Sequence, residues 1–170
     1  AGIRYTDDEK DAFHVDFTVP IIPSVPINVA DDHVSWDLAL AYAMSDSTQL
    51  YARVASGFRA PTIQDRIADD VAVTTADSET IMSYEIGVKG QSERFRYNLA
   101  AFYYDIDDMQ LVAIGGNANA TTLLNAQGGE GYGVEIEMDY LLTDDLIVSG
   151  GFGYASTEIK DSTLSVPAGP

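Results

Sequence analysis

The sequence predicts an all-β protein: an antiparallel, up-and-down transmembrane β-barrel fragment of about seven strands. Three observations predict it. Segments of about ten residues alternate between apolar and polar side chains, long and short connections follow one another, and aromatic residues on the apolar faces gather near the strand ends. No run of about 18 apolar residues is present, as a transmembrane helix would need.

Strands in the first half of the chain are separated by a proline-rich loop. Ala1–Thr6 alternates, Asp7–Lys10 is polar, and alternation returns from Phe13 to Phe17. We expect a loop over Thr18–Asp32, because Pro20, Pro23 and Pro26 lack the N–H that a regular ladder requires. Val34–Met44 has six apolar residues at alternate positions and is the clearest strand. A short turn, Ser45–Thr48, leads to the next strand, Leu50–Arg59.

The second half repeats this arrangement. We expect strands over Ser83–Gly90, Phe95–Ile106, Gly131–Tyr140 and Leu146–Ile159, with Phe102 on the wrong face of the second. Long loops are expected over Ala60–Ile81 and Asp107–Asn125, the latter with possible strand extensions at Leu111–Ile114 and Thr121–Leu124. Gln91–Arg94 and Leu141–Asp145 are short turns. In an up-and-down barrel, long loops at one rim and short turns at the other are typical of outer-membrane proteins, with the long loops extracellular and the short turns periplasmic.

The two faces of the strands differ in chemistry. Tyr132 and Tyr140 lie on one apolar face, roughly 20 Å apart along a tilted strand, which approaches the height of a lipid-facing band. Burying the charges of the opposite face in a protein core would be prohibitive, so we expect that face to line a lumen. The lumen-facing residues are Arg53, Glu85, Lys89, Arg96, Glu135 and Glu137. A soluble β-sandwich is the alternative fold.

Composition excludes several functions. Nine Lys and Arg against 27 Asp and Glu give a net charge of −18, which excludes a nucleic-acid partner. The chain has no Cys, so thiol catalysis, disulfides and thiolate metal sites are excluded. His14 and His33 are expected at loop edges without catalytic spacing. We therefore expect no enzyme activity and no cofactor.

Two further patterns are candidate binding sites. Gly128–Gly133 is rich in glycine but does not fit the dinucleotide-binding pattern. Asp105, Asp107 and Asp108 lack the spacing of a calcium loop, and a solvated strand end is the favoured interpretation. Calcium in the acidic loops remains an open alternative.

Several stretches together resemble the β-barrel of TonB-dependent outer-membrane receptors. They are Ala1–Tyr5, Leu50–Arg53 with Ser56–Pro61, Ser78–Thr80 with Ser83–Gly90, Ala100–Tyr104 with Asp108–Gln110, and Gly131–Glu137. The resemblance implies a barrel of about 22 strands around an N-terminal plug domain. It also implies a bacterial outer-membrane location. Residues 1–170 would then be a partial barrel domain without the plug and the remaining strands.

The resemblance also implies a function, active import of a scarce nutrient. The expected partners are the TonB complex, through the missing N-terminal region, a ferric siderophore or similar ligand, and outer-membrane lipid. Cobalamin, haem and oligosaccharides remain alternative substrates, and a passive porin or a soluble adhesion module are alternative functions. Within the Pro61–Ile81 loop and at its base we expect ligand contacts from Arg59, Gln64 and Arg66, since a guanidinium can bind an anionic chelate.

Overall fold

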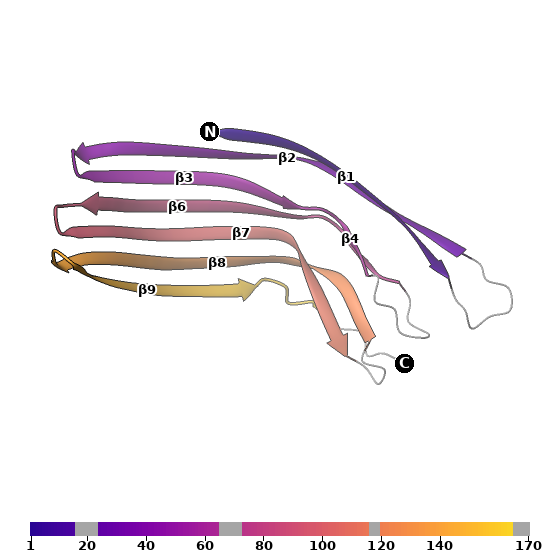
Figure 1. Ribbon diagram of the computed structural model, residues 1–170. Coiled ribbons are helices and arrows are strands. Elements are labelled where there is room, and N and C mark those ends of the chain that lie inside the picture. The colour runs from indigo at the N-terminus through magenta and orange to yellow at the C-terminus, as the bar shows by residue number, and fades with distance from the viewer. Residues whose placement is uncertain (16–23, 65–72, 116–119, 165–170) are drawn as a thin grey trace.

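Seven strands form one antiparallel sheet, in which each strand pairs with the strand of that sheet that comes next along the chain (Figure 1). The computed structural model describes residues 1–15, 24–64, 73–115 and 120–164. The sheet runs in the order β1-β2-β3-β6-β7-β8-β9, and β4 and β5 form a separate two-stranded sheet. The strands are β1 (Gly2–Val15), β2 (Ser24–Ser45), β3 (Thr48–Arg59), β4 (Thr62–Ile63), β5 (Thr75–Ala76), β6 (Glu79–Gln91), β7 (Phe95–Gly115), β8 (Ala120–Thr143) and β9 (Leu146–Ile159).

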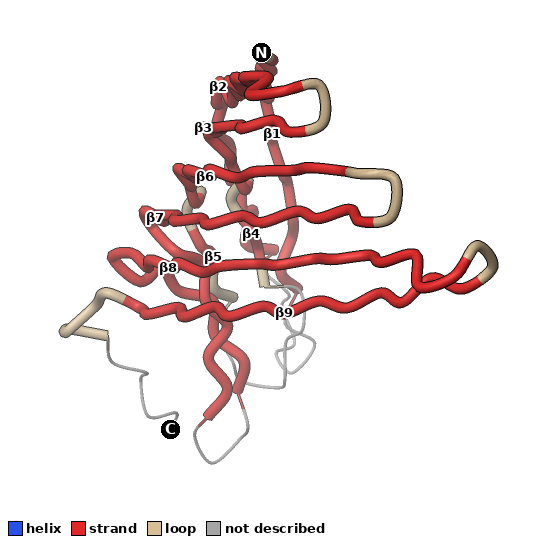
Figure 2. Tube along the Cα trace, turned by 90° about the vertical axis from the view of Figure 1, so that its left-hand side faces the viewer, coloured by secondary structure: helices blue, strands red, loops and turns tan. Residues whose placement is uncertain are grey.

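The three tight turns, β2–β3, β6–β7 and β8–β9, lie at the same end of the sheet (Figure 2). We call this the short-turn end, and the opposite end the long-loop end. The first turn is tied to the next strand by a hydrogen bond of 2.9 Å from Gln91 N to Ser47 O. The predicted sorting of the short turns to one rim is confirmed.

Two predicted loops are largely strand, so their predicted bounds are wrong. β1 continues through Asp7–Lys10, and β2 begins at Ser24 with Pro26 opposite Phe13. Pairing between β2 and β3 starts only at Asp37, so β2 has β1 as its one described neighbour at Pro26. A proline is tolerated in such an edge segment because one side of the strand needs no donor. Pro20 and Pro23 lie outside the described residues.

The second correction concerns the predicted Asp107–Asn125 loop. Strands β7 and β8 remain paired as far as Gly115 and Ala120, so the suggested extensions are parts of long strands. Asp108 interrupts the ladder with a φ of 54°. An aspartate tolerates this left-handed conformation better than most residues.

The apolar face of the sheet is open rather than packed against a second layer. Leu40, Ile86 and Phe152 have exposed fractions of 67%, 61% and 61%. The buried apolar residues of the described chain, Ala76, Ile106, Leu123 and Ala126, all lie toward the long-loop end. A soluble sandwich would cover such a face, so this alternative does not fit. In the part of the chain that the structure describes, no helix is long and apolar enough to cross a membrane.

Aromatic side chains form rows across neighbouring strands. Tyr84 of β6 lies opposite Tyr103 of β7, which lies opposite Tyr132 of β8. At the short-turn end, Phe95 lies opposite Tyr140. The aromatics are in register across the sheet, as in the girdles of a membrane barrel. Phe95 and Tyr140 lie near strand ends as predicted, but the tyrosine row crosses the middle of β6, β7 and β8, because these strands extend further than predicted.

Candidate functional site

The six charged residues expected on one face do share it. Arg53 pairs with Glu85 across β3 and β6, and the ladder continues from Glu85 to Phe102 of β7. Because opposite residues in an antiparallel ladder point to the same side, this register defines one polar face. It carries Arg53, Glu85, Lys89, Arg96, Glu135 and Glu137.

Each of the three predicted cations, Arg53, Lys89 and Arg96, has a partner. Arg53 Nε lies 3.2 Å from Asp37 Oδ2. Arg96 donates to Asp139 Oδ2 through Nε at 2.9 Å and Nη2 at 2.6 Å. Lys89 Nζ lies 4.6 Å from the centroid of the Tyr51 ring. Asp139 lies directly opposite Arg96 in the ladder, whereas Asp37 and Tyr51 lie diagonally across from Arg53 and Lys89.

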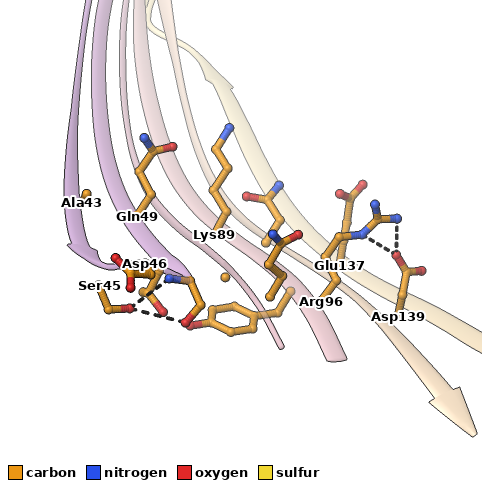
Figure 3. A pocket seen from close by; sticks show the side chains of 14 residues that line it. Ala43, Ser45, Asp46, Gln49, Lys89, Arg96, Glu137 and Asp139 are labelled. Atoms are coloured by element: carbon orange, nitrogen blue, oxygen red, sulfur yellow. Dashed lines mark hydrogen bonds and ion pairs between the residues drawn. The ribbon is translucent and has the colours of Figure 1, made fainter. Parts of the chain in front are cut away.

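A hollow of about 580 Å³ opens on the polar face at the short-turn end (Figure 3). Lys89, Arg96, Glu137 and Asp139 bring both signs of charge to it. Such a surface suits polar, hydrogen-bonding groups more than an ion of one charge. Within the described ranges, no group of three or more His, Asp or Glu residues could hold a metal ion.

The predicted ligand residues lie at the long-loop end. Arg59 is the last residue of β3, and its Nη1 lies 4.0 Å from Glu79 Oε2 while 58% of its side chain stays exposed. Gln64 follows β4, and its backbone N donates to Thr74 O at 2.9 Å. Arg66 lies outside the described residues. Arg59 and Gln64 thus lie on either side of the short strand β4.

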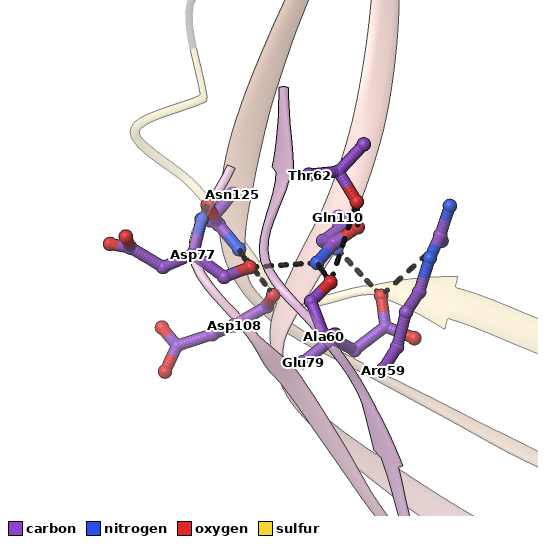
Figure 4. A network of polar contacts seen from close by, with 8 residues as sticks. All are labelled: Arg59, Ala60, Thr62, Asp77, Glu79, Asp108, Gln110 and Asn125. Atoms are coloured by element: carbon purple, nitrogen blue, oxygen red, sulfur yellow. Dashed lines mark hydrogen bonds and ion pairs between the residues drawn. The ribbon is translucent and has the colours of Figure 1, made fainter. Parts of the chain in front are cut away.

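A polar network that the sequence does not reveal lies beside Arg59 (Figure 4). Gln110 of β7, whose exposed fraction is 7%, donates from Nε2 to Ala60 O at 2.9 Å and to Asp77 O at 2.8 Å. Its backbone N donates to Glu79 Oε2 at 2.7 Å. Gln110 stands between Met109 and Leu111 in an otherwise apolar stretch, and this isolated amide is the signal that could have found it.

Asn125 of β8 completes the network. It lies directly opposite Gln110 in the ladder. Its Nδ2 donates to Asp77 O at 3.0 Å and to Asp108 O at 2.7 Å, and its Oδ1 accepts from Asp77 N at 2.8 Å. The connection between β5 and β6 is therefore hydrogen-bonded to both strands of the β7–β8 hairpin.

His33 lies within β2 instead of at the loop edge expected for it, whereas His14 is the penultimate residue of β1, close to residues outside the described ranges. His14 pairs with Val25 in the β1–β2 ladder. His33 lies in β2, and its ring stacks on Phe58 with centroids 4.9 Å apart. The early prolines obscured this part of the ladder.

Two carboxylates beyond the tyrosine row have shifted pKa values. Lys160 forms an ion pair and a hydrogen bond with Glu130, and Tyr103 donates a second hydrogen bond to the same carboxylate. These hydrogen bonds, that from Lys160 first, lower the pKa of Glu130. Asp161 accepts from Gln127 N at 3.0 Å and from Thr163 N and Oγ1, both at 2.8 Å. These hydrogen bonds, that from Gln127 first, lower the pKa of Asp161.

Comparison with known proteins identifies the family to which the chain belongs. Residues 1–169 match the family model described as TonB dependent receptor-like, beta-barrel. The chain belongs to this family, whose members are proteins of the bacterial outer membrane. It is 30% identical over 105 residues, 62% of the chain, to the vitamin B12 transporter BtuB of Vibrio vulnificus, and 29% identical over 107 residues, 63% of the chain, to the pesticin receptor of Yersinia pestis.

Solved structures show the same fold. The ferric yersiniabactin uptake receptor FyuA from Yersinia pestis superimposes with a TM-score of 0.76 over 93% of the chain, at 19% identity. The copper transporter OprC gives a TM-score of 0.75 over 92% of the chain, at 16% identity. The chain spans 17% and 16% of the length of the two curated relatives, and 24% and 26% of these two structures.

Proposed function

We propose that the complete protein is an active-transport receptor, which binds a scarce nutrient at the long-loop end and imports it with energy from a TonB complex. The observation that carries this proposal is the family match over residues 1–169. The long-loop end would then face the outside of the cell, the polar face would line the lumen, and the apolar face would meet lipid. Import of this kind requires no covalent chemistry.

A ferric siderophore is the proposed substrate. The structurally similar FyuA is, by name, a ferric yersiniabactin uptake receptor, and the exposed guanidinium of Arg59 lies at the long-loop end. A guanidinium binds an anionic chelate through charge-assisted hydrogen bonds, which are stronger in a partly desolvated mouth. Vitamin B12 is the alternative substrate, because the BtuB relative transports it by name.

Deletion of the gene in the source bacterium tests the proposal. Uptake of radiolabelled iron supplied as a panel of ferric siderophores, and of labelled cobalamin, is measured with and without the gene and with and without functional TonB. We expect iron uptake to need both. Uptake that persists without TonB would indicate a passive porin, and loss of cobalamin uptake alone would replace the siderophore with the vitamin.

Paired arginine substitutions test the ligand contacts. Arg59→Ala and Arg66→Ala in the intact receptor should weaken binding of the transported ligand by about tenfold each, as expected for a lost charge-assisted hydrogen bond. Arg94→Ala is the matched control, because Arg94 is an exposed arginine at the short-turn end paired with Asp144. Unchanged affinity in both test variants would remove these residues from the site.

A further inference from the structure

The β4–β5 hairpin is fastened on two sides to strands that are distant in sequence. On one side, Lys10 Nζ of β1 donates to Pro61 O at 2.9 Å, and the Ser78 hydroxyl donates to Asp31 of β2. On the other side, Gln110 and Asn125 bind the carbonyl groups of Ala60 and Asp77. The hairpin therefore bridges β1–β2 and β7–β8 across the ends of β3 and β6.

Gln110 makes the most contacts in this bridge. Its side-chain amide donates both N–H groups, one to the strand entering the hairpin at Ala60 and one to the strand leaving it at Asp77. Its Oε1 accepts from Thr62 Oγ1 at 3.1 Å. All three contacts end on the segment from Ala60 to Asp77, so one buried side chain closes the base of the hairpin (Figure 4).

Only an amide can make this set of contacts at position 110. The two carbonyl groups need donors, and the Thr62 hydroxyl needs an acceptor. A carboxylate of the same shape accepts but cannot donate, and it would meet two carbonyl oxygens with a negative charge. Since buried polar groups without partners are costly, such a change should release the hairpin from β7.

We propose that Gln110 is a positioning residue for ligand binding: it fixes residues 60–64 and 73–78 against β7–β8, so that these residues and Arg59 meet the ligand in one preformed arrangement. Arg59 shares Glu79 with Gln110, because Glu79 Oε2 accepts from Gln110 N and lies 4.0 Å from Arg59 Nη1. This inference rests on one part of the proposed function, the binding of the ligand at the long-loop end, and does not depend on TonB-driven import. A preformed site binds more tightly, because less ordering is required on association.

Gln110→Glu in the full-length receptor tests the positioning role. Hydrogen exchange should quicken by about tenfold or more over residues 60–64 and 73–78, since local opening controls exchange, and remain unchanged in β3 and β6. Affinity for the transported ligand should fall by about tenfold, mainly through slower association. The melting temperature of the barrel should not change.

Gln91→Glu is the matched control. It adds the same charge at an exposed glutamine of the short-turn end, and it should change neither exchange nor affinity. Asn125→Asp is a second test variant, because it keeps the acceptor for Asp77 N and loses both donated hydrogen bonds. It should act in the same direction as Gln110→Glu.

A disulfide separates positioning from a general structural role. Thr74 Oγ1 accepts from Leu123 N at 2.9 Å, so these two positions are neighbours and are the pair chosen for a cysteine cross-link between the hairpin and β8. In the Gln110→Glu background, the oxidised Thr74→Cys/Leu123→Cys receptor should recover its affinity and the reduced one should not. A residue that merely supports the barrel would show no such redox-dependent rescue.

Each result of these experiments tests a different part of the proposal. Unchanged hydrogen exchange in Gln110→Glu overturns the fixing of the hairpin. Faster exchange with unchanged affinity overturns the positioning role and means that the ligand does not bind at this hairpin. The gene-deletion experiment tests TonB-dependent uptake independently of this result. Faster exchange, weaker binding and disulfide rescue together support the proposal.

Discussion

Glycines on the sheet face aromatic rings at several directly opposed positions. Gly87 lies opposite Tyr51, Gly131 opposite Tyr104, and Gly133 opposite Phe102. A Cβ added at each glycine would meet the ring across the ladder. Each ring therefore covers the backbone of a neighbouring strand, which explains why Phe102 occupies the polar face despite its apolar character.

Gly133→Ala should destabilise the receptor by roughly 1–3 kcal/mol, as overpacking does. The new Cβ would meet the Tyr154 carbonyl oxygen as well as Phe102 Cζ, at 2.5 Å from the latter. The backbone oxygen cannot rotate away. Gly153→Ala is the matched control, because a Cβ there meets nothing within 4 Å. Chemical denaturation of both variants checks this, and equal stabilities would contradict it.

Asp161 makes the stability of the segment after β9 depend on pH. Its pKa is lowered in the folded chain by the hydrogen bonds from Gln127 and Thr163. The stabilisation is therefore complete above the unfolded pKa of about 3.9 and is lost as the pH falls through the lower folded value. Exchange protection of the Gln127 and Thr163 amides, corrected for intrinsic rates, should decrease in that acidic range. Asp161→Asn should abolish this pH dependence, and an unchanged profile in the variant would rule out Asp161 as its cause.

Alternation in the sequence indicates which residues share a face, because a ladder carries each side chain to a fixed side; that the charged face lines a lumen stays a prediction. Alternation does not predict Gln110. The partners of Gln110 are carbonyl groups of Ala60 and Asp77, and backbone groups look alike in every sequence. Only the folded path of the chain brings those two segments to one side chain.

At the scale of elements, strand centres are predictable and strand ends are not. β1 runs through Asp7–Lys10 although these residues are polar, because its ladder with β2 continues past them, with Asp7 opposite Asp32 and Lys10 opposite Val29. Asn28 Nδ2 donates to Glu9 Oε1 at 3.1 Å and to Asp11 Oδ1 at 2.9 Å. Beyond the apolar band both faces of a strand can be polar, so the alternation that marks a strand disappears while its hydrogen bonds continue.

A charged side chain introduced on the apolar face should lower the stability of the folded receptor much more than the same side chain introduced on the polar face. Leu40→Arg places a guanidinium on the lipid side of β2, with an expected loss of about 2–4 kcal/mol if the position is near the bilayer centre. Ala41→Arg, the next residue, is the control on the polar face and should cost much less. Folding of the intact receptor into lipid vesicles across a urea series measures both. Equal losses would contradict the assignment of the two faces.

The whole sheet is a single open layer with edges at β1 and β9. Unpaired strand edges and an exposed apolar face both promote association. Expressed alone, the chain should therefore sediment or require detergent, whereas the full-length receptor should be monodisperse in detergent. Size-exclusion chromatography with and without detergent checks this. A monodisperse chain in plain buffer would mean that its apolar face is covered in some other way.

The strand order of the main sheet has a consequence for how the molecule assembles. Because each strand bonds to its neighbours in the chain, most pairings close only a small loop, and the entropy lost in closing a loop grows with its length. The pairing of β3 with β6 is the exception, since residues 60–78 lie between them. Pairing β3 with β6 should therefore be slower than forming the β6–β7 hairpin next to it, which places the kinetic bottleneck of this region at the same hairpin base that Gln110 later closes.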